Sequence, residues 1–262
     1  MRSVRKHAVV VAALAAAVLS VAPALAVTGG APDGAGHPNV GALIADLPGR
    51  GLSPVCSGTL VSSTVFLTAG HCTAALAGQG VERVWVTFDT ALDPAGWSLH
   101  AGTYRTDPAF GHDQSDLHDL AVVLLDAPVP GIGPASLPEA GILDRLGAQA
   151  GLRGATFVNV GYGYNDRLTG GGGPELVYDG LRRVSTSRFA ALTRSWLKLS
   201  NHGDGGSQSG VCFGDSGGPR FLGTTVVAVT SGGDATCSGM SSSYRLDTPS
   251  ARQFLGQYVT LP

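Results

Sequence analysis

The segment at positions 214–219, Gly-Asp-Ser-Gly-Gly-Pro, sets one serine among three glycines and an aspartate. A serine hydroxyl is a weak nucleophile until a base takes its proton, so a reactive Ser216 needs an imidazole and an acid from elsewhere in the chain. Glycines let a backbone approach a substrate closely, where its N–H groups can bind a developing oxyanion. The segment therefore predicts acyl-transfer chemistry with Ser216 as the nucleophile.

Two further segments offer the base and the acid. His71 lies in Thr-Ala-Gly-His-Cys at positions 68–72, and Asp119 directly precedes the apolar run Leu120–Leu125. An imidazole can take the serine proton at neutral pH and return it to the leaving group. A carboxylate at the edge of a buried strand needs hydrogen-bond donors, and a histidine N–H is one. We therefore expect His71 to act as the base and Asp119 to orient it.

His118 is the competing base, because it adjoins Asp119 in the sequence. Neighbouring residues of a strand point to opposite faces, so His118 and Asp119 are not expected to share one site. Asp113 and Asp116 compete as the acid, but neither is followed directly by an apolar strand. The prediction remains the pairing of His71 with Asp119.

The three segments, in the order His71, Asp119 and Ser216, resemble those of the chymotrypsin-like serine proteases, the trypsin-fold family. The resemblance extends over residues 27–262. It implies an all-β fold of two six-stranded antiparallel β-barrels with the active site between them, followed by a short C-terminal helix. It also implies a secreted serine endopeptidase whose oxyanion hole consists of the N–H groups of Gly214 and Ser216. No cofactor is expected.

Short β-prone runs separated by Gly, Pro, Asp and Ser independently favour a barrel or a sandwich. The clearest runs are Val55–Val61, Val65–Thr68, Val81–Phe88, Leu120–Leu125, Thr156–Val160 and Thr225–Thr230. Pro128–Pro138 is rich in proline and predicts the crossing between an N-terminal barrel, about 27–137, and a C-terminal barrel, about 138–262. The spacing of Phe254, Leu255 and Tyr258 predicts a short amphipathic helix within Ala251–Val259.

Four cysteines, Cys56, Cys72, Cys212 and Cys237, allow three disulfide pairings in an exported chain. The family resemblance favours Cys56 with Cys72 and Cys212 with Cys237, since the family has short-range bridges at these places. Each bridge would then fix a reactive segment, because Cys72 follows His71 and Cys212 shortly precedes the nucleophile. The alternative is a pair of surface staples without catalytic consequence. No metal site is expected, since the chain lacks clustered Cys and His spacing.

Residues 1–26 have the pattern of a secretory signal peptide. Arg2, Arg5 and Lys6 make a basic start, Ala8–Leu19 is apolar but too short to span a bilayer comfortably, and Ala-Leu-Ala at 24–26 is a cleavage signal. An uncleaved membrane anchor is the alternative. We expect a secreted, extracellular protein that has no membrane segment after cleavage and whose protease domain comprises residues 27–262.

The family resemblance also implies that Asp215 interacts with the N-terminus of the protease domain. Members of the family become active when a new N-terminus inserts and pairs its ammonium with the aspartate before the nucleophile. Val-Thr-Gly-Gly at 27–30 resembles that N-terminus and follows Ala26 directly. We therefore expect signal cleavage itself to release Val27 for its ion pair with Asp215, without a separate propeptide.

The resemblance also implies a specificity pocket. Trypsin-like members that cleave after Arg or Lys have an aspartate six residues before the nucleophile, where this chain has Gly210. Ser231 and Gly233 match the pocket wall, with Gly232 in place of the usual aromatic residue between them. Ser242 completes the set, although a one-residue shift of the alignment would change that assignment. The expected pocket is uncharged and open, suited to apolar or medium-sized side chains and not to Arg or Lys.

Charge and composition limit the partners. Three of the 17 Lys and Arg residues and none of the 19 acidic residues lie in the leader, which leaves 14 basic and 19 acidic residues, a formal charge of about −5. This balance does not indicate nucleic-acid binding. Lysine occurs only at Lys6 and Lys198, a composition that we expect of a GC-rich bacterial genome. We expect polypeptide substrates, protein protease inhibitors as further partners, and a monomer.

Two other functions stay open on the sequence. A binding protein that keeps the protease fold without activity would usually lack a catalytic residue, whereas all three are present here. An esterase could use the same acyl chemistry. An α/β-hydrolase, however, would carry Gly-x-Ser-x-Gly with its histidine after the serine, and the order here is the reverse.

Overall fold

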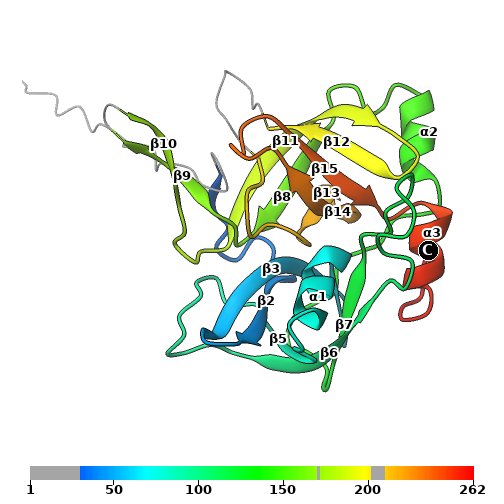
Figure 1. The fold of residues 1–262 in the computed structure, drawn as a ribbon. Coiled ribbons are helices and arrows are strands. Elements are labelled where there is room, and N and C mark those ends of the chain that lie inside the picture. Colours follow the sequence, from blue (N-terminus) through cyan, green and yellow to red (C-terminus); the bar gives the residue numbers. More distant parts are fainter. Residues whose placement is uncertain (1–29, 170–171, 202–209) are drawn as a thin grey trace, which may run out of the picture.

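Runs rich in β-branched and aromatic residues, ended by Gly, Pro, Asp or Ser, form the strands that dominate this protein. The computed structural model describes residues 30–169, 172–201 and 210–262. As the sequence predicts, the strands close into two six-stranded antiparallel β-barrels. Figure 1 shows the second barrel above the first, with the C-terminal helix at their side.

The first barrel is built from the strands of residues 40–125, in the order β2-β3-β4-β7-β6-β5. These strands are β2 (Val40–Leu47), β3 (Gly51–Ser62), β4 (Val65–Thr68), β5 (Arg83–Thr87), β6 (His100–Thr106) and β7 (Ala121–Leu125). Leu43, Leu60, Phe66 and Val122 are fully buried in its core. Each such side chain stabilises the barrel by about 1.5–3 kcal/mol relative to an exposed position.

The second barrel closes where β8 pairs with β11. Its strands are β8 (Thr156–Gly161), β11 (Arg183–Leu192), β12 (Trp196–Ser200), β13 (Pro219–Leu222), β14 (Thr225–Gly233) and β15 (Met240–Arg245). The short strand β1 (Ala31–Pro32) adds to β11, so the start of the described chain lies on the second barrel. A hairpin of β9 (Asn165–Thr169) and β10 (Gly172–Val177) projects from this barrel (Figure 1).

All six runs that the sequence predicts as strands overlap strands of the structure. Two short helices were not expected, α1 (Gly70–Ala77) and α2 (Ile142–Ala148). Neither has a side-chain N-cap, and each has about two turns, too few for a helical period to stand out in the sequence. The predicted C-terminal helix is present as α3 (Pro249–Leu255), with Pro249 in its first turn and its N-cap at Thr248, whose hydroxyl accepts a hydrogen bond from Ala251 N.

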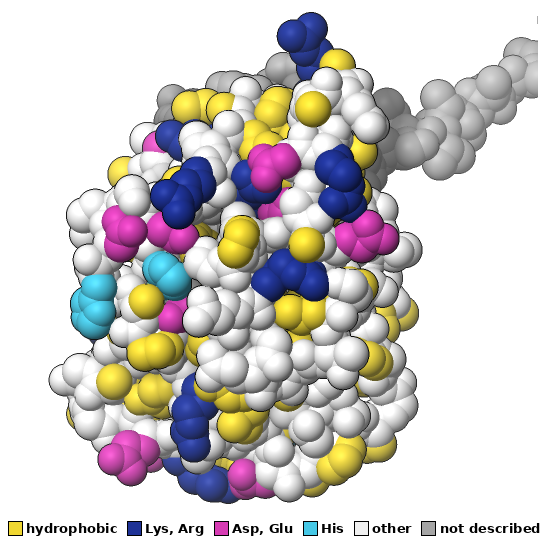
Figure 2. Space-filling view, turned by 90° about the vertical axis from the view of Figure 1, so that its right-hand side faces the viewer, with side chains coloured by type: hydrophobic (Ala, Val, Ile, Leu, Met, Phe, Trp, Pro, Cys, Tyr) yellow, Lys and Arg dark blue, Asp and Glu magenta, His cyan; other side chains and the backbone are white. Residues whose placement is uncertain are grey.

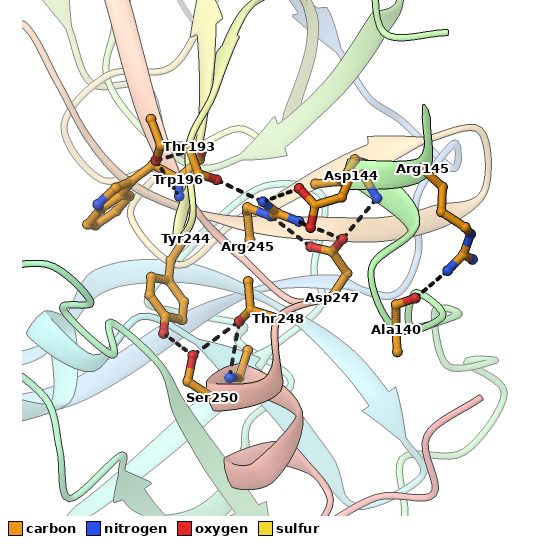
Figure 3. Close-up of polar contacts among 12 residues, drawn as sticks. Ala140, Asp144, Arg145, Thr193, Trp196, Tyr244, Arg245, Asp247, Thr248 and Ser250 are labelled. Atoms are coloured by element: carbon orange, nitrogen blue, oxygen red, sulfur yellow. Dashed lines mark hydrogen bonds and ion pairs between the residues drawn. The ribbon is translucent and has the colours of Figure 1, made fainter. Parts of the chain in front are cut away.

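Arg245, at the end of β15, fastens α2 to the second barrel (Figure 3). Its guanidinium binds both carboxylate oxygens of Asp144 in α2, at 2.8 and 3.0 Å, and both of Asp247, at 2.9 Å. It also donates to the carbonyl of Thr193. The hydrogen bonds from Arg245 lower the pKa of Asp144. A planar guanidinium is suited to this bidentate geometry, which joins three segments distant in sequence.

The interior of the second barrel also holds a buried cation, Arg220. Its guanidinium donates to the hydroxyls of Ser241 and Ser243, each at 2.8 Å, and to the side-chain oxygen of Asn159. Burial lowers the pKa of Arg220 to about 9. The core of this barrel is therefore partly a polar network, unlike the apolar core of the first barrel.

Figure 2 shows the side of the molecule that carries α2 and α3, where basic and acidic side chains are interspersed rather than gathered by sign. Within the described residues, no helix is long and apolar enough to cross a membrane.

Candidate active site

The structure brings His71 against Asp119. The backbone N–H of His71 donates to Asp119 Oδ1 at 2.8 Å, and His71 Nδ1 lies 2.9 Å from Oδ2. Asp119 is 1% exposed, whereas the imidazole is half-buried and retains contact with solvent. A hydrogen bond from Nδ1–H to the carboxylate fixes the tautomer in which Nε2 is the basic nitrogen.

A glycine allows this contact, because α1 packs closely against the start of β7. A Cβ atom on Gly70 would lie 3.0 Å from both the N and the O of Leu120, and 3.1 Å from the ring of Phe110. Helix α1 begins at Gly70, so His71 stands in its first turn directly beside Asp119. Gly70 therefore lies at the closest approach of the two segments.

Ser231 contacts the same carboxylate. It lies in β14 of the second barrel, and its hydroxyl donates a hydrogen bond to Asp119 Oδ2. Asp119 thus receives donors from both barrels, which satisfies the buried charge.

His118 points away from Asp119, as expected. The reason is not the alternation of side chains along a strand, because His118 lies outside β7. It precedes β7 and has a positive φ of 54°. Its Nδ1 lies 3.1 Å from Asp107 Oδ2, and its Nε2 lies 3.8 Å from Asp116. Asp116 in turn accepts hydrogen bonds from Tyr244 and Ser250. These groups form a separate cluster that links the first barrel to α3.

Ser216 lies where its loop crosses to the first barrel. Its carbonyl accepts a hydrogen bond from Ser57 N at 2.8 Å. The next residue, Gly217, has φ +82°, and a Cβ atom there would lie 2.1 Å from Thr68 Oγ1 and 2.9 Å from Ala69 N. Ser216 is therefore held close to the segment that carries His71. Among the described residues, no hydrogen bond joins the Ser216 hydroxyl to His71; such bonds often tighten only when substrate binds.

The nucleophile loop presents two backbone donors. The N–H groups of Asp215, Gly217 and Gly218 bind the carbonyls of Cys212, Thr230 and Asp215, respectively. Within the described part of the chain, the N–H groups of Gly214 and Ser216 donate to no such carbonyl. Gly214 has φ +93°, a conformation that favours glycine. Two backbone N–H donors of this kind, two positions apart in one loop, can bind an oxyanion.

Asp215 is buried, with 1% of its surface exposed. Its carboxylate accepts hydrogen bonds from Cys212 N and Gly163 N, both at 2.9 Å. Burial raises the pKa of Asp215 to about 6, although these two bonds and the charge of Arg220 act in the opposite direction. Val27, its expected partner, lies outside the described residues.

A hollow of about 210 Å³ adjoins Ser216. We call it the nucleophile hollow; its lining includes Val211–Phe213, Thr230–Asp234 and Cys237. It therefore contains Ser231 and Gly233, two of the residues expected in the specificity pocket. Gly210 and Ser242, the other two, are not part of this lining. Ser242 lines a different hollow beside Trp196, while Ser241, one position earlier, is fully buried against Arg220.

The side chain of Asn201 occupies the space next to Gly210. A Cβ atom on Gly210 would lie 2.1 Å from Cγ and 2.2 Å from Oδ1 of Asn201. The Asn201 amide donates to the Cys237 carbonyl at 3.3 Å and accepts from the Ser241 hydroxyl at 3.2 Å. A neutral amide thus stands where a side chain at position 210 would begin.

The two disulfides have the pairings that the family resemblance favours. Cys56 is bonded to Cys72, and Cys212 to Cys237, with sequence separations of 16 and 25. The first bridge ties β3 to α1 next to His71, and the second contributes both cysteines to the nucleophile hollow. Cys56, His71 and Cys72 come close together, but the two sulfurs are bonded to each other and offer no thiolate to a metal.

Sequence reasoning missed Ser57 and Asn201. Ser57, in β3, donates its hydroxyl to the Gly214 carbonyl and accepts a hydrogen bond from Tyr162 N. Asn201 contacts Gly210 only in the folded chain. Their residue types carry no local signal, because both act through partners remote in sequence.

Three comparisons with known proteins bear on this site. A family model described as Trypsin matches residues 38–252. A trypsin from Phaedon cochleariae is 30% identical over 186 residues, which cover 68% of this chain and 68% of that protein. Among solved structures, that of HL collagenase aligns with a TM-score of 0.63 and 18% identity, covering 84% of this chain and 92% of that one. At this identity the collagenase likeness concerns the fold alone.

Proposed function

The chain belongs to the trypsin family and is a serine endopeptidase, and from that premise we propose that Ser216, His71 and Asp119 are its catalytic triad. The observation that carries this proposal is the contact of His71 Nδ1 with the buried Asp119, because it leaves Nε2 as the basic nitrogen on a half-exposed imidazole.

In the proposed reaction, Ser216 Oγ attacks the carbonyl carbon of the scissile peptide bond while His71 takes the hydroxyl proton. His71 then gives this proton to the leaving amine, the C–N bond breaks, and the acyl group remains as an ester on Ser216. A water molecule, deprotonated by His71, attacks the ester and releases the acid, and the proton returns to Ser216. Asp119 orients the imidazole and stabilises its charged form throughout.

The N–H groups of Gly214 and Ser216 are the proposed oxyanion hole. They would bind the negative oxygen of both tetrahedral intermediates, where loss of one donor in comparable enzymes costs about 10²–10³ in turnover. We propose that the nucleophile hollow is the specificity pocket, which binds the side chain of the residue before the scissile bond. Its Ser231 and Gly233 are uncharged and the neutral Asn201 amide stands next to Gly210. The carboxylate in the lining, Asp234, accepts hydrogen bonds from the backbone N–H groups of Thr236 and Gly239, so cleavage after Arg or Lys is not expected.

We further propose secretion, with cleavage after Ala26 and insertion of the Val27 ammonium beside Asp215. The buried carboxylate supports this, because burial raises its pKa and, among the described residues, its hydrogen-bond donors are the backbone N–H groups of Cys212 and Gly163 rather than a cationic side chain. N-terminal sequencing of the secreted protein tests the proposal: the expected first residue is Val27, and a start well downstream would contradict it.

Fluorophosphonate labelling tests the triad. The processed protein should be labelled at Ser216, and Ser216→Ala should lose labelling and about 10⁴-fold or more of its peptidase turnover while its thermal unfolding stays cooperative. Correctly processed, folded protein that is not labelled would indicate an inactive binding protein. Ser216-dependent hydrolysis of short esters without cleavage of any member of a peptide library would favour the esterase alternative.

A further inference from the structure

A second hollow, of about 450 Å³, lies on the other side of the segment that walls the nucleophile hollow. We call it the lysine hollow, and it shares Ser231–Gly233 with the nucleophile hollow. The other residues that line it are Leu117, Trp196, Lys198, Met240 and Ser242. Two of the three shared residues are glycines, so this segment presents mainly backbone atoms to both hollows. One short segment of β14 therefore separates the two hollows.

Gly232 is the reason that the lysine hollow is open. A Cβ atom at this position would have no heavy atom within 4 Å. The sequence has glycine here in place of the aromatic residue that its family resemblance leads one to expect. The vacated space is bounded by Trp196, whose ring packs edge-on against Tyr244 at 5.6 Å, so this wall is fixed.

Lys198 points into this space from two strands away. In the antiparallel ladder, Gly232 stands opposite Ser242, and Ser242 stands opposite Lys198. Directly opposed residues share one face of a sheet, and two strand spacings place the Lys198 backbone roughly 9–10 Å from that of Gly232. An extended lysine side chain covers most of this distance.

The charge of Lys198 is not matched by a carboxylate within the described residues. None of their ion pairs includes its ammonium, and Lys198 is the charged residue in the lining of the lysine hollow. Asp119, behind Ser231, is already bound to His71 and Ser231. The hollow therefore combines apolar walls with one cation, the combination that suits an acidic side chain.

The direction of a bound peptide follows from the position of the two hollows. A peptide that adds as a strand along Ser231–Gly233 has side chains that alternate between its two faces. If the residue before the scissile bond enters the nucleophile hollow, the second and fourth residues before that bond face the lysine hollow. The third residue does not.

We propose that the lysine hollow is a substrate subsite for Asp or Glu at the second or fourth position before the scissile bond, bound by the Lys198 ammonium. This inference rests on the proposed function, because it assumes that Ser216 defines the cleavage point. It makes the enzyme selective for acidic sequences upstream of an uncharged cleavage residue.

Matched peptides test this inference. Each carries Glu, Gln or Ala at the second, third or fourth position before a fixed uncharged cleavage residue, and kcat/KM is measured at low and high salt. Glu should exceed Gln by about threefold to tenfold at the second or fourth position, since a partly shielded ion pair is stronger than an exposed one. The preference should shrink at 1 M salt, where the Debye length falls to about 3 Å.

Variants of the lysine assign the effect. Lys198→Met keeps the aliphatic stem and should bring the ratio of Glu to Gln close to one, Lys198→Arg should keep the preference, and Lys198→Glu should reverse it. Arg194→Met is the matched control, because Arg194 is exposed and lines a different hollow, next to α3; it should leave the ratio unchanged.

The outcomes separate the two proposals. Ser216-dependent hydrolysis with equal rates for Glu and Gln, or a preference that Lys198→Met leaves intact, would overturn the subsite while the proposed function stands. Absence of any Ser216-dependent hydrolysis would overturn the proposed function and the subsite with it.

Discussion

The hydroxyl of Ser57 donates a hydrogen bond of 2.9 Å to the carbonyl of Gly214, a residue 157 positions later in the chain. Ser57 is fully buried in the first barrel, and Gly214 opens the nucleophile loop of the second. The same hydroxyl accepts a hydrogen bond from Tyr162 N, and Ser57 N donates to the Ser216 carbonyl. One side chain of the first barrel thus fixes the backbone whose N–H groups are the proposed oxyanion hole.

Ser57→Ala should therefore lower turnover more than substrate affinity. The Gly214 carbonyl would lose its donor and Tyr162 N its acceptor, so the loop could rotate away from the oxyanion position. We expect kcat to fall about tenfold, less than for loss of an oxyanion donor itself, with little change in KM. Steady-state kinetics with one peptide substrate measures both quantities.

A serine on the same strand provides the control for this prediction. Ser53 is half-buried at the outer end of β3 and bonds only a nearby turn carbonyl among the described residues, so Ser53→Ala should match the wild type. Equal kcat for Ser57→Ala and the wild type would show that the loop holds its shape without this hydroxyl. Because Ser57→Ala leaves the buried Gly214 carbonyl and Tyr162 N–H without their partner, it should also lower the unfolding free energy by about 1–3 kcal/mol.

The Asn201 side chain occupies the space that a side chain at position 210 would need, so substitutions at the two positions should be energetically coupled. Gly210→Ala places a methyl group about 2 Å from the buried Asn201 amide and should lower the melting temperature clearly, since overpacking costs about 1–3 kcal/mol. Asn201→Gly removes the obstructing side chain. The double variant Asn201→Gly/Gly210→Ala should be more stable than the sum of the single effects allows, by about 1 kcal/mol or more.

Thermal unfolding of the four proteins in this cycle measures the coupling. Gly223→Ala is an unsuitable comparison because of its positive φ, so Gly133→Ala, at an exposed position with no atom near the added methyl group, is the control. Strict additivity of the two single changes would mean that Asn201 moves aside without cost.

The sequence could predict the parts of this protein that depend on local pattern. Because Leu120–Leu125 is an unbroken apolar run, the sequence predicts a buried strand with Asp119 at its edge. Strand β7 confirms this prediction. The two barrels and the disulfide pairings followed from the family resemblance and agree with the structure. The contacts between the two barrels could not be predicted from the sequence. Ser57 is one serine among many until the fold sets it against Gly214.

The pocket shows the same limit at a single position. Ser242 was expected in the specificity pocket, on an alignment that a one-residue shift would change. In the structure Gly233 stands opposite Ser241 and Gly232 opposite Ser242, with a bulge between Thr230 and Gly232. A one-residue change of register moves a side chain to the other face of a sheet. Sequence carried no signal for the bulge, and therefore none for the face on which Ser242 lies.

The two disulfides should affect catalysis differently when removed. Each closes a short loop, so Cys56→Ala/Cys72→Ala and Cys212→Ala/Cys237→Ala should each cost about 3 kcal/mol of unfolding free energy. The first pair adjoins His71 and should mainly lower kcat. The second pair lines the nucleophile hollow and should mainly raise KM. Kinetics below the lowered melting temperatures distinguishes them, and identical kinetic effects would mean that both bridges act on stability alone.

Asp215 gives the chain a pH-dependent stability whose sign depends on its N-terminus. Where no ammonium reaches it, its pKa of about 6 exceeds the value of 3.8 for a free aspartate. The folded form then holds this proton more tightly than the unfolded form, so the contribution to stability is fully present below about pH 3.8 and is lost as pH rises through about 6. The loss at pH 8 amounts to about 3 kcal/mol.

Asp215→Asn therefore has opposite effects in the two forms of the protein. In the chain that retains residues 1–26, the variant should melt several degrees above the wild type at pH 8 and at the same temperature near pH 4, because the amide carries no charge to bury. In the chain that begins at Val27, it should melt lower and lose activity, because the ion pair with the ammonium is gone. Melting curves from pH 4 to 8 test both forms, with Asp93→Asn, an exposed turn residue, as the control. A lower melting temperature for Asp215→Asn at pH 8 in the longer chain would show that the carboxylate is already paired before cleavage.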